Sequence, residues 1–256
     1  MGINTKIDWC DATWNPVTGC LHDCPYCYAR RIATRFGGNL MPIFTEHPVL
    51  RKPVRDAEGK TCPYPFDFAP TFHKYRLNDP QKWKKPRTIF VCSMADLFGE
   101  WVPDEWIMDI LNACRKAPQH RYLFLTKNPT RYDALEDAGV IRPTDTNFWL
   151  GSTTTIVTHD LLHWNGAMHT FQSCEPMLAP WPPASEPNRE AIKLNAMPEW
   201  VIFGAETGNR KDKVIPEKAW IDNAVMMCHN IAAKVFMKES LRGIMGDDFI
   251  QEFPWE

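Results

Sequence analysis

The sequence predicts an α/β fold, a partial or near-complete parallel (β/α) barrel of the TIM type with about six or seven strands and long loop excursions. Three observations predict it. From residue 88 onward, strand-like runs alternate with helix-like runs, as in a parallel sheet covered by helices. Polar residues follow the strand-like runs, as they do at the carboxyl ends of barrel strands. A length of 256 residues suits a single domain of this class.

The expected strands are short runs rich in β-branched and aromatic residues. A first strand is expected at residues 14–18, just before a cysteine-rich loop. The further strands are expected at residues 88–92, 122–126, 148–151, 170–173, 200–204 and 234–237. Together they come close to the eight strands of a closed barrel.

Helix-like segments lie between these strands. After the cysteine loop, residues 28–36 place Tyr28, Ile32 and Phe36 on one stripe, and a Gly-Gly pair then ends the segment. A second helix is expected to begin near residue 103, with Pro and two acidic residues in its first turn. Further helices are expected at residues 129–138 and 216–233, and their apolar stripes are expected to be buried in the core.

Two Pro-rich stretches without periodicity, residues 39–87 and 179–198, are expected to be loop excursions from one domain that spans residues 1–256. The first excursion mixes basic and aromatic residues, as a nucleic-acid backbone groove with stacking surfaces would. The alternative is a solvated surface loop whose aromatic residues pin it to the barrel. The residues concerned are Lys74, Arg76, Lys82, Lys84, Lys85 and Arg87, with Phe72, His73, Tyr75 and Trp83.

The overall composition says more about the cellular compartment of the protein than about its binding partner. A formal net charge of −2 and a pI near 6.4 provide no global electrostatic case for binding nucleic acid or an anionic membrane. The first residues lack the apolar core of a signal peptide, and no apolar run approaches the roughly 18 residues that would span a bilayer. We therefore expect a soluble cytoplasmic protein that does not associate with a membrane and whose cysteines are reduced.

Cys20, Cys24 and Cys27 are spaced C-x3-C-x2-C in one loop, and Tyr26 precedes the third cysteine. Three thiolates can hold three irons of a [4Fe–4S] cluster and leave the fourth iron free to bind a small molecule. The alternative is part of a structural zinc site that a distant Cys or His completes. The remaining cysteines provide no second C-x2-C pair, which favours the cluster. His159 and His163, four residues apart, could clasp another metal on a helix.

Polar residues follow six of the expected strands. Taken singly, each has a simple interpretation as a helix cap or turn residue, but six strands that end alike argue for a shared site. Lys127 and Lys238 need an anionic or hydrogen-bonding partner inside a barrel mouth. A ligand carboxylate or phosphate would serve, and so would Glu175 or Glu206 in a structural ion pair.

The cysteine spacing together with Tyr26 resembles the signature of the radical S-adenosylmethionine (SAM) superfamily. A wider set of segments resembles an uncharacterised phage-associated family of radical-SAM-like proteins. These segments are residues 14–16, 19–20, 27–29, 93–98, 125–127, 175–176 and 204–208. The resemblance implies a [4Fe–4S] cluster and SAM as cofactors, an electron donor such as flavodoxin or ferredoxin, and the host cytoplasm as the compartment.

The resemblance also implies a reaction and roles for particular residues. A reduced cluster would pass one electron to SAM, and the resulting 5′-deoxyadenosyl radical would remove a hydrogen from the substrate. Lys127, Glu175 and Lys238 are the candidates for catalytic residues. The resemblance assigns Ser93 and Asp96 to the SAM amino group, Ser152 and Thr154 to the ribose, Gly204, Ala205 and Glu206 to the surroundings of the adenine, and Tyr26 to the cofactor site.

The expected substrate is a nucleic acid or nucleotide, with rearrangement, modification or repair of a phage DNA base as the reaction. The basic excursion and the phage-family resemblance favour it. Two alternatives stay open. One is a zinc-stapled, non-catalytic nucleic-acid-binding protein, and the other is a radical SAM enzyme that acts on a peptide or a small amino compound.

Overall fold

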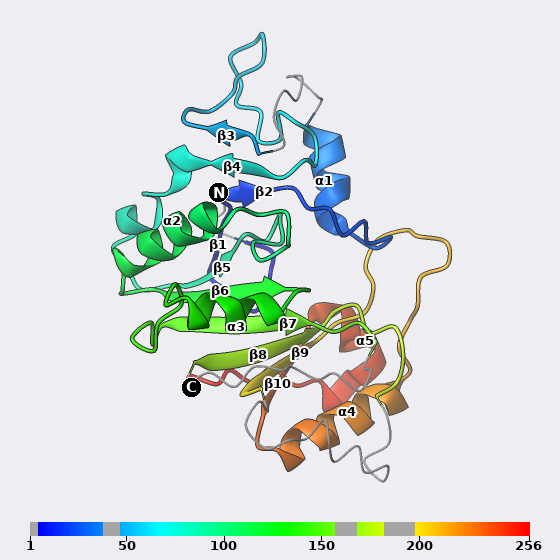
Figure 1. Ribbon diagram of the computed structural model, residues 1–256. Coiled ribbons are helices and arrows are strands. Elements are labelled where there is room, and N and C mark those ends of the chain that lie inside the picture. The colour runs from blue at the N-terminus through cyan, green and yellow to red at the C-terminus, as the bar shows by residue number, and fades with distance from the viewer. Residues whose placement is uncertain (1–4, 38–46, 157–167, 182–197) are drawn as a thin grey trace. The chain divides into compact units, whose positions relative to one another are not determined.

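The computed structural model describes residues 5–37, 47–156, 168–181 and 198–256 (Figure 1). Seven strands form one sheet in the order β1-β5-β6-β7-β8-β9-β10, and three short strands form a second sheet in the order β2-β4-β3. This confirms the predicted class, an α/β fold of the partial parallel-barrel type. The contacts divide the chain into two compact units, Met1–Asn128 and Pro129–Glu256, and each is described by itself.

The first unit contributes β1 (Ala12–Trp14), β5 (Thr88–Val91) and β6 (Arg121–Thr126) to the larger sheet. The three strands pair in parallel. Helix α2 (Asp104–Arg115) connects β5 to β6 and begins after Pro103, as the sequence predicts. The connection brings the carboxyl ends of β5 and β6 side by side, because parallel strands share an orientation.

The strand expected at residues 14–18 is two strands in different sheets. After β1, strand β2 (Val17–Thr18) pairs antiparallel with β4 (Thr71–His73), and β4 pairs in parallel with β3 (Val49–Leu50). Pro16 explains the break, because proline has no N–H to donate to a sheet. The first excursion therefore contains two strands and two short 3-10 helices, Lys74–Arg76 and Pro80–Lys82, although loops were expected. Its residues 39–46 lie outside the described ranges.

Helix α1 (Tyr28–Phe36) has the predicted bounds and stops at Gly37. Its buried face is not its apolar stripe: Ala29 and Ala33 are buried, whereas Tyr28, Ile32 and Phe36 are 42%, 37% and 55% exposed. The two alanines pack against aromatic residues of the first excursion. The small alanine side chains allow this close approach, and this packing places the predicted stripe on the exposed side of the helix.

The second unit contributes β7 (Phe148–Thr153), β8 (His169–Cys174), β9 (Trp200–Phe203) and β10 (Lys234–Met237), which pair in parallel in that order. The helices in the described part of this unit are α3 (Thr130–Asp137), α4 (Lys218–Asn230) and the short α5 (Arg242–Met245). A 3-10 turn, Glu239–Leu241, precedes α5, and another, Gly246–Asp248, follows it. The predicted strands and long helices of this unit are confirmed. No helix in the described ranges is both long and apolar enough to cross a bilayer.

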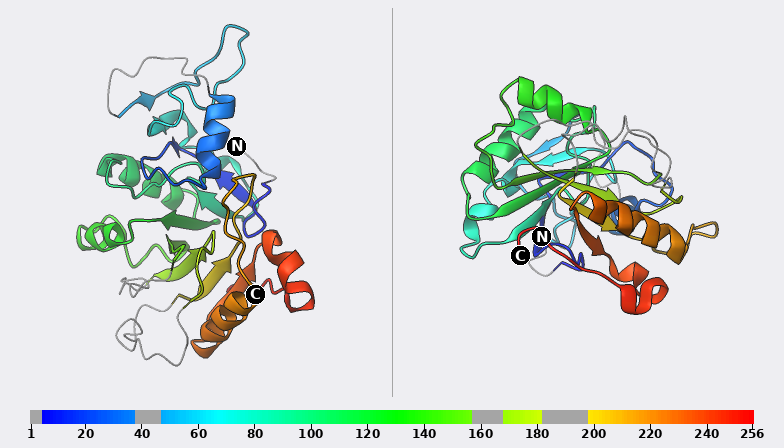
Figure 2. Two further views of the ribbon diagram at one scale, coloured as in Figure 1. Left: turned by 90° about the vertical axis from the view of Figure 1, so that its right-hand side faces the viewer. Right: turned by 90° about the horizontal axis from the view of Figure 1, so that it is seen from below.

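The strands of the second unit are covered on both faces. On one face, Cys174, Phe203 and Met237 form a cluster with Ala224 and Cys228 of α4. Figure 2 shows α4 as the orange helix beside the strands of this unit. The opposite face is aromatic: the rings of Phe171 and Phe236 contact Trp200, and the C-terminal rings of Phe253 and Trp255 pack there as well. Residues 157–167 and 182–197 are not described, so the His159 and His163 pair and most of the second excursion lie outside the described residues.

Candidate functional site

The cysteine loop, residues 19–27, lies between β2 and α1 in the first unit. Cys20, Cys24 and Cys27 are half-buried and carry free thiols. The backbone is anchored where the loop begins: the N–H of Gly19 donates to the Met94 carbonyl at 2.9 Å, and the N–H of Cys20 donates to the Phe68 carbonyl at 3.2 Å. The entry into the loop is therefore tied to the end of β5 and to the first excursion.

Cys27 ends the loop and caps helix α1. Its Sγ accepts a hydrogen bond from the N–H of Arg30 at 3.3 Å. The Arg30 guanidinium donates to the carbonyl of Cys20 at 3.4 Å and lies over the Phe68 ring, 4.9 Å from its centroid. Burial raises the pKa of the Cys20 thiol to about 11, so this thiol is protonated at neutral pH unless a metal displaces the proton.

Asp96, after β5, accepts hydrogen bonds on both oxygens. Oδ1 accepts from the N–H of Phe98 at 3.0 Å and the hydroxyl of Thr126 at 2.7 Å. Oδ2 accepts from the N–H of Lys127 at 2.9 Å and from Nε2 of His22 at 2.7 Å. A carboxylate offers about four acceptor positions, and protein donors take all of them here. We therefore do not assign Asp96 to the SAM amino group.

Lys127, after β6, points to the cysteine loop. Its Nζ donates to the hydroxyl of Tyr26 at 3.3 Å and lies 5.5 Å from the centroid of the Tyr26 ring. The sequence predicts an anionic or hydrogen-bonding partner for this lysine, and the partner is the aromatic residue that precedes the third cysteine. Two predicted site residues, 101 positions apart, are thereby brought together.

Ser93 lies in a segment that Asn15 and Tyr28 hold in place. Its hydroxyl donates to Oδ1 of Asn15 at 3.2 Å, and the same oxygen accepts from the N–H of Met94 at 3.0 Å. The Ser93 carbonyl accepts from the hydroxyl of Tyr28 at 2.6 Å. Just before it, Cys92 has a φ of 58°, which is uncommon for a residue other than glycine. Asn15 thus holds the Ser93 segment in place, a role that the residues around Asn15 in the sequence do not indicate.

In the second unit, Glu175 and Lys238 form an ion pair in which Nζ donates to Oε1. Glu175 follows β8 and Lys238 follows β10, while Gly204 follows β9 between them. A Cβ at Gly204 would lie 3.1 Å from Cγ of Glu175 and 3.2 Å from Cδ of Lys238. The two side chains thus lie against the open Cα of Gly204, and they remain 26% and 20% exposed.

The neighbours of Gly204 are bonded within the second unit. The N–H of Ala205 donates to Oγ of Ser240 at 3.0 Å, and the N–H of Gly204 donates to the carbonyl of Cys174 at 3.1 Å. Glu206 is buried and accepts two hydrogen bonds, each 2.7 Å long, from Arg210. These residues are close in sequence and in space, but the N–H groups of Gly204 and Ala205 are already used.

Ser152 and Thr154, predicted near the ribose, are both associated with Gln172. Ser152 lies within β7, opposite Gln172 of β8, so the two residues share a face of the sheet. That face also carries Cys174, which packs in the cluster with α4. Thr154 accepts a hydrogen bond from Nε2 of Gln172 at 2.7 Å. Ser152 is thus buried on the helix-covered face, and we do not carry it forward as a ribose contact.

The basic excursion has fewer free side chains than its composition indicates. Phe72 and His73 are buried, so neither can stack on a base. Lys74 pairs with Asp109 at 2.8 Å. Lys82 pairs with Asp79 at 2.7 Å, and the Arg76 guanidinium donates to the carbonyl of Asn15 at 2.8 Å. Most of this segment therefore matches the alternative of a surface segment pinned by its aromatic residues.

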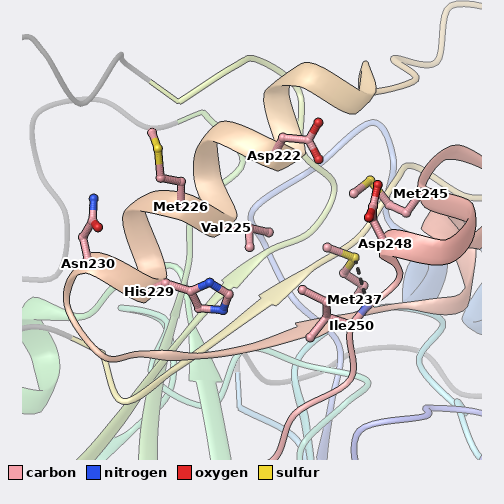
Figure 3. A pocket seen from close by; sticks show the side chains of 9 residues that line it. All are labelled: Asp222, Val225, Met226, His229, Asn230, Met237, Met245, Asp248 and Ile250. Atoms are coloured by element: carbon pink, nitrogen blue, oxygen red, sulfur yellow. Dashed lines mark hydrogen bonds between the residues drawn. The ribbon is translucent and has the colours of Figure 1, made fainter.

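A hollow of about 430 Å³ lies in the second unit between α4 and the C-terminal segment (Figure 3). Met237 and Met245 line it together with His229. Asp222 and Asp248, also on its wall, are both paired with Lys218, at 2.8 and 2.9 Å. No predicted site residue lines this hollow, and its two acidic groups share one lysine partner.

A single bound metal ion needs several donor side chains grouped around one point. Among the described residues, which include all nine cysteines, no three His, Cys, Asp or Glu side chains are grouped so that they could hold one ion. The three thiols of the loop therefore do not converge on one point. A site for one ion is not preformed in this part of the chain.

Fold and site together define a protein of the partial parallel-barrel class with a three-cysteine loop before its first long helix. Residues 4–243 match the family described as Protein of unknown function (DUF5131), and the chain belongs to that family. Comparisons with curated proteins and with solved structures returned no match.

Proposed function

We propose that this protein is a radical SAM enzyme that holds a [4Fe–4S] cluster on Cys20, Cys24 and Cys27. The observation that carries the proposal is the loop itself, which holds three free thiols within eight residues. Backbone hydrogen bonds fix the start of the loop, and its last cysteine caps helix α1. A set of three soft thiolates fits iron–sulfur clusters, and it leaves one iron open for SAM.

The spacing of the cysteines favours the cluster over a zinc staple, because no second C-x2-C pair accompanies the loop. Zinc binds each sulfur at about 2.3 Å in a tetrahedron, so its ligand sulfurs converge to roughly 3.8 Å from one another. In a cluster each thiolate binds a different iron, so the sulfurs do not need to converge on one ion.

When bound, the cluster and SAM supply one-electron chemistry that removes a hydrogen atom from the substrate. The contribution of the chain is to hold the loop, to orient Tyr26 through Lys127 and to exclude water around the half-buried thiols. A small protein such as flavodoxin or ferredoxin would deliver the electron.

The test is anaerobic reconstitution with iron and sulfide, followed by dithionite and SAM. We expect about four irons per chain, a brown absorption near 400 nm and reductant-dependent 5′-deoxyadenosine. Cys24→Ala should abolish all three, whereas Cys10→Ala, which alters a half-buried cysteine outside the loop, should abolish none. One tightly held zinc with no 5′-deoxyadenosine would contradict the proposal.

For the substrate, we propose a nucleic acid or nucleotide whose phosphates meet Lys84 and Lys85, two exposed lysines of the basic excursion. Binding to duplex, single strand and mononucleotide should weaken steeply as salt rises. The double variant Lys84→Ala/Lys85→Ala should weaken binding and flatten this salt dependence. Unchanged binding by the variant would favour the alternative of a peptide or small amino compound.

We also propose a catalytic role for Glu175 and Lys238. Their ion pair is partly solvated, so a charged ligand can open it at a lower cost than it could open a fully buried pair. Lys238→Gln should lower the yield of 5′-deoxyadenosine or of product without lowering the iron content. If yield and iron content are both unchanged, the pair is structural only.

A further inference from the structure

We infer that Asp96 and Lys127 are positioning residues that hold the cysteine loop in shape before any metal binds. They act through two other residues, His22 and Tyr26, which are bonded to them. The purpose of this arrangement rests on the proposed function. The arrangement itself can be tested on the metal-free protein.

The two contacts lie on either side of the central cysteine. His22 lies between Cys20 and Cys24, and its Nε2 donates to Oδ2 of Asp96 at 2.7 Å. Tyr26 lies between Cys24 and Cys27, and its hydroxyl accepts from Nζ of Lys127 at 3.3 Å. Each gap between successive cysteines therefore has one side chain fixed to the end of a sheet strand.

Both contacts share one anchor. The backbone N–H of Lys127 donates to Oδ2 of Asp96, the same oxygen that His22 meets, so the ends of β5 and β6 are joined at this carboxylate. Asp96 is only 6% exposed, and Phe98 and Thr126 hold its other oxygen. The anchor therefore stays in place when a single loop contact is removed.

The His22 ring is also held by packing. It meets the ring of Trp101 edge-on, with the centroids 4.8 Å apart. One position further along the loop, Asp23 has a φ of 52°, a backbone conformation that only surrounding contacts make favourable. A loop with this backbone gains from being ordered before the metal arrives.

The first test measures hydrogen exchange of residues 20–27 in the metal-free protein. His22→Ala removes one loop contact and leaves Asp96 with three donors, so the fold is retained while the loop opens. We expect about tenfold faster exchange in this segment. His22→Gln, whose amide can replace the Nε2 donor, should restore slow exchange.

Leu21→Ala is the matched control, because Leu21 is the neighbouring exposed side chain of the same loop. It should leave exchange unchanged. Equal exchange in His22→Ala and Leu21→Ala would overturn the inference. Tyr26→Phe provides an independent test at the other contact, and it should raise exchange by a smaller factor because the ring remains near the Lys127 ammonium.

The second test loads each variant with iron and sulfide under anaerobic conditions. Outer residues that orient metal ligands typically change metal affinity about tenfold or more, so His22→Ala should retain about tenfold less iron during dialysis against a chelator, and His22→Gln should recover it. Retention equal to wild type would overturn the positioning role. If the wild type binds no cluster but His22→Ala still accelerates exchange, the proposed function fails and the loop contacts stand.

Discussion

At the scale of single residues, Gly19 allows the chain to turn from strand β2 of the small sheet into the cysteine loop. Its φ is 91°, and a Cβ at this position would lie 2.2 Å from the carbonyl oxygen of Ala69 and 2.7 Å from that of Phe68. Its N–H meanwhile bonds to Met94. Only glycine satisfies the backbone angle and the close contact together, so the position of Cys20 depends on this residue.

Gly19→Ala should therefore lower the free energy of unfolding by roughly 2 kcal/mol or more, because backbone strain and a clash with main-chain atoms add together. The matched control is Gly59→Ala, where φ is 79° but nothing lies within 4 Å of the added Cβ. The control should cost only about 1 kcal/mol. Urea unfolding of both variants measures the difference, and equal losses would show that the close contact with Ala69 does not matter.

At the scale of elements, helix α1 packs through its smallest side chains. Ala29 and Ala33 face the aromatic residues of the first excursion, while Ile32 is 37% exposed. The apolar stripe of the sequence indicates the opposite orientation. Two buried alanines determine the contact because the opposing aromatic rings leave space only for small side chains.

A matched pair of substitutions on α1 tests this orientation. Ala33→Leu adds bulk to a fully buried position and should lower the free energy of unfolding by about 1–3 kcal/mol. Ile32→Ala, one position away, should change it by less than about 0.5 kcal/mol. Thermal and urea unfolding measure both, and a larger loss for Ile32→Ala would show that the helix is rotated.

The small sheet contains a buried histidine that links two of its strands. Nε2 of His73, on β4, meets Oγ of Thr18, on β2, at 2.8 Å. Burial lowers the pKa of His73 to about 2, with the nearby Arg76 as a smaller cause. The ring is therefore neutral in the folded protein at every pH at which the protein is handled.

The stability contributed by a neutral His73 should depend on pH. The unfolded chain binds a proton at His73 below a pH of about 6.5 and the folded chain does not, so this contribution is complete above that pH. It is lost progressively as pH falls from about 6.5 toward 2, by up to about 1.4 kcal/mol per pH unit. His73→Gln should flatten the decline in urea-unfolding free energy between pH 7.5 and 5, whereas His229→Gln, on a half-exposed side chain, should not. Parallel declines in His73→Gln and wild type would contradict the assignment.

At the scale of the whole molecule, the nine cysteines separate into two classes. Five are buried, at positions 62, 92, 114, 174 and 228, and four are half-buried, at positions 10, 20, 24 and 27. Burial raises the pKa of the Cys10 thiol to about 12 and that of Cys20 to about 11. Reactivity in the metal-free protein should therefore concentrate at Cys24 and Cys27 of the cysteine loop.

Alkylation of the native, metal-free protein near pH 8, followed by peptide mass spectrometry, should label Cys24 and Cys27 first. Cys10 and Cys20 should follow more slowly, because less of each thiol is ionised. The five buried cysteines should react only after denaturation, which also serves as the control that every peptide is detected. Rapid native labelling of Cys228 would contradict the packing of α4 against the sheet.

Most of the larger sheet could be predicted because its signals are local. Runs such as Tyr122–Thr126 carry their strand preference in neighbouring residues, and the intervening helices show their own period. The small sheet could not be predicted, because its strands are two or three residues long and pair across the Pro-rich excursion. So short a strand has no recognisable period, and only the partner strand defines it.

The residues of the candidate site likewise fall into those that the sequence locates and those whose partners only the fold defines. The three cysteines lie within eight residues of one another, so their spacing alone locates the loop. Asp96 and Lys127 could be placed at strand ends, but their roles could not, because His22 lies 74 residues from Asp96 and Tyr26 lies 101 residues from Lys127. The face on which Ser152 lies could not be predicted, because the face of a strand residue depends on register, and register is set by the neighbouring strand.

By itself the sequence determined that this protein alternates parallel strands with helices and carries three thiols in one loop, because hydrophobic period and cysteine spacing are properties of neighbouring residues. Only the tertiary structure decided what each polar side chain bonds to. It bonded Asp96, an expected contact of the SAM amino group, to His22 of the cysteine loop, and it paired Lys238 with Glu175 against Gly204. The physical reason is that hydrogen bonds and ion pairs are satisfied by whichever groups the fold brings within reach, and those groups come from distant parts of the chain.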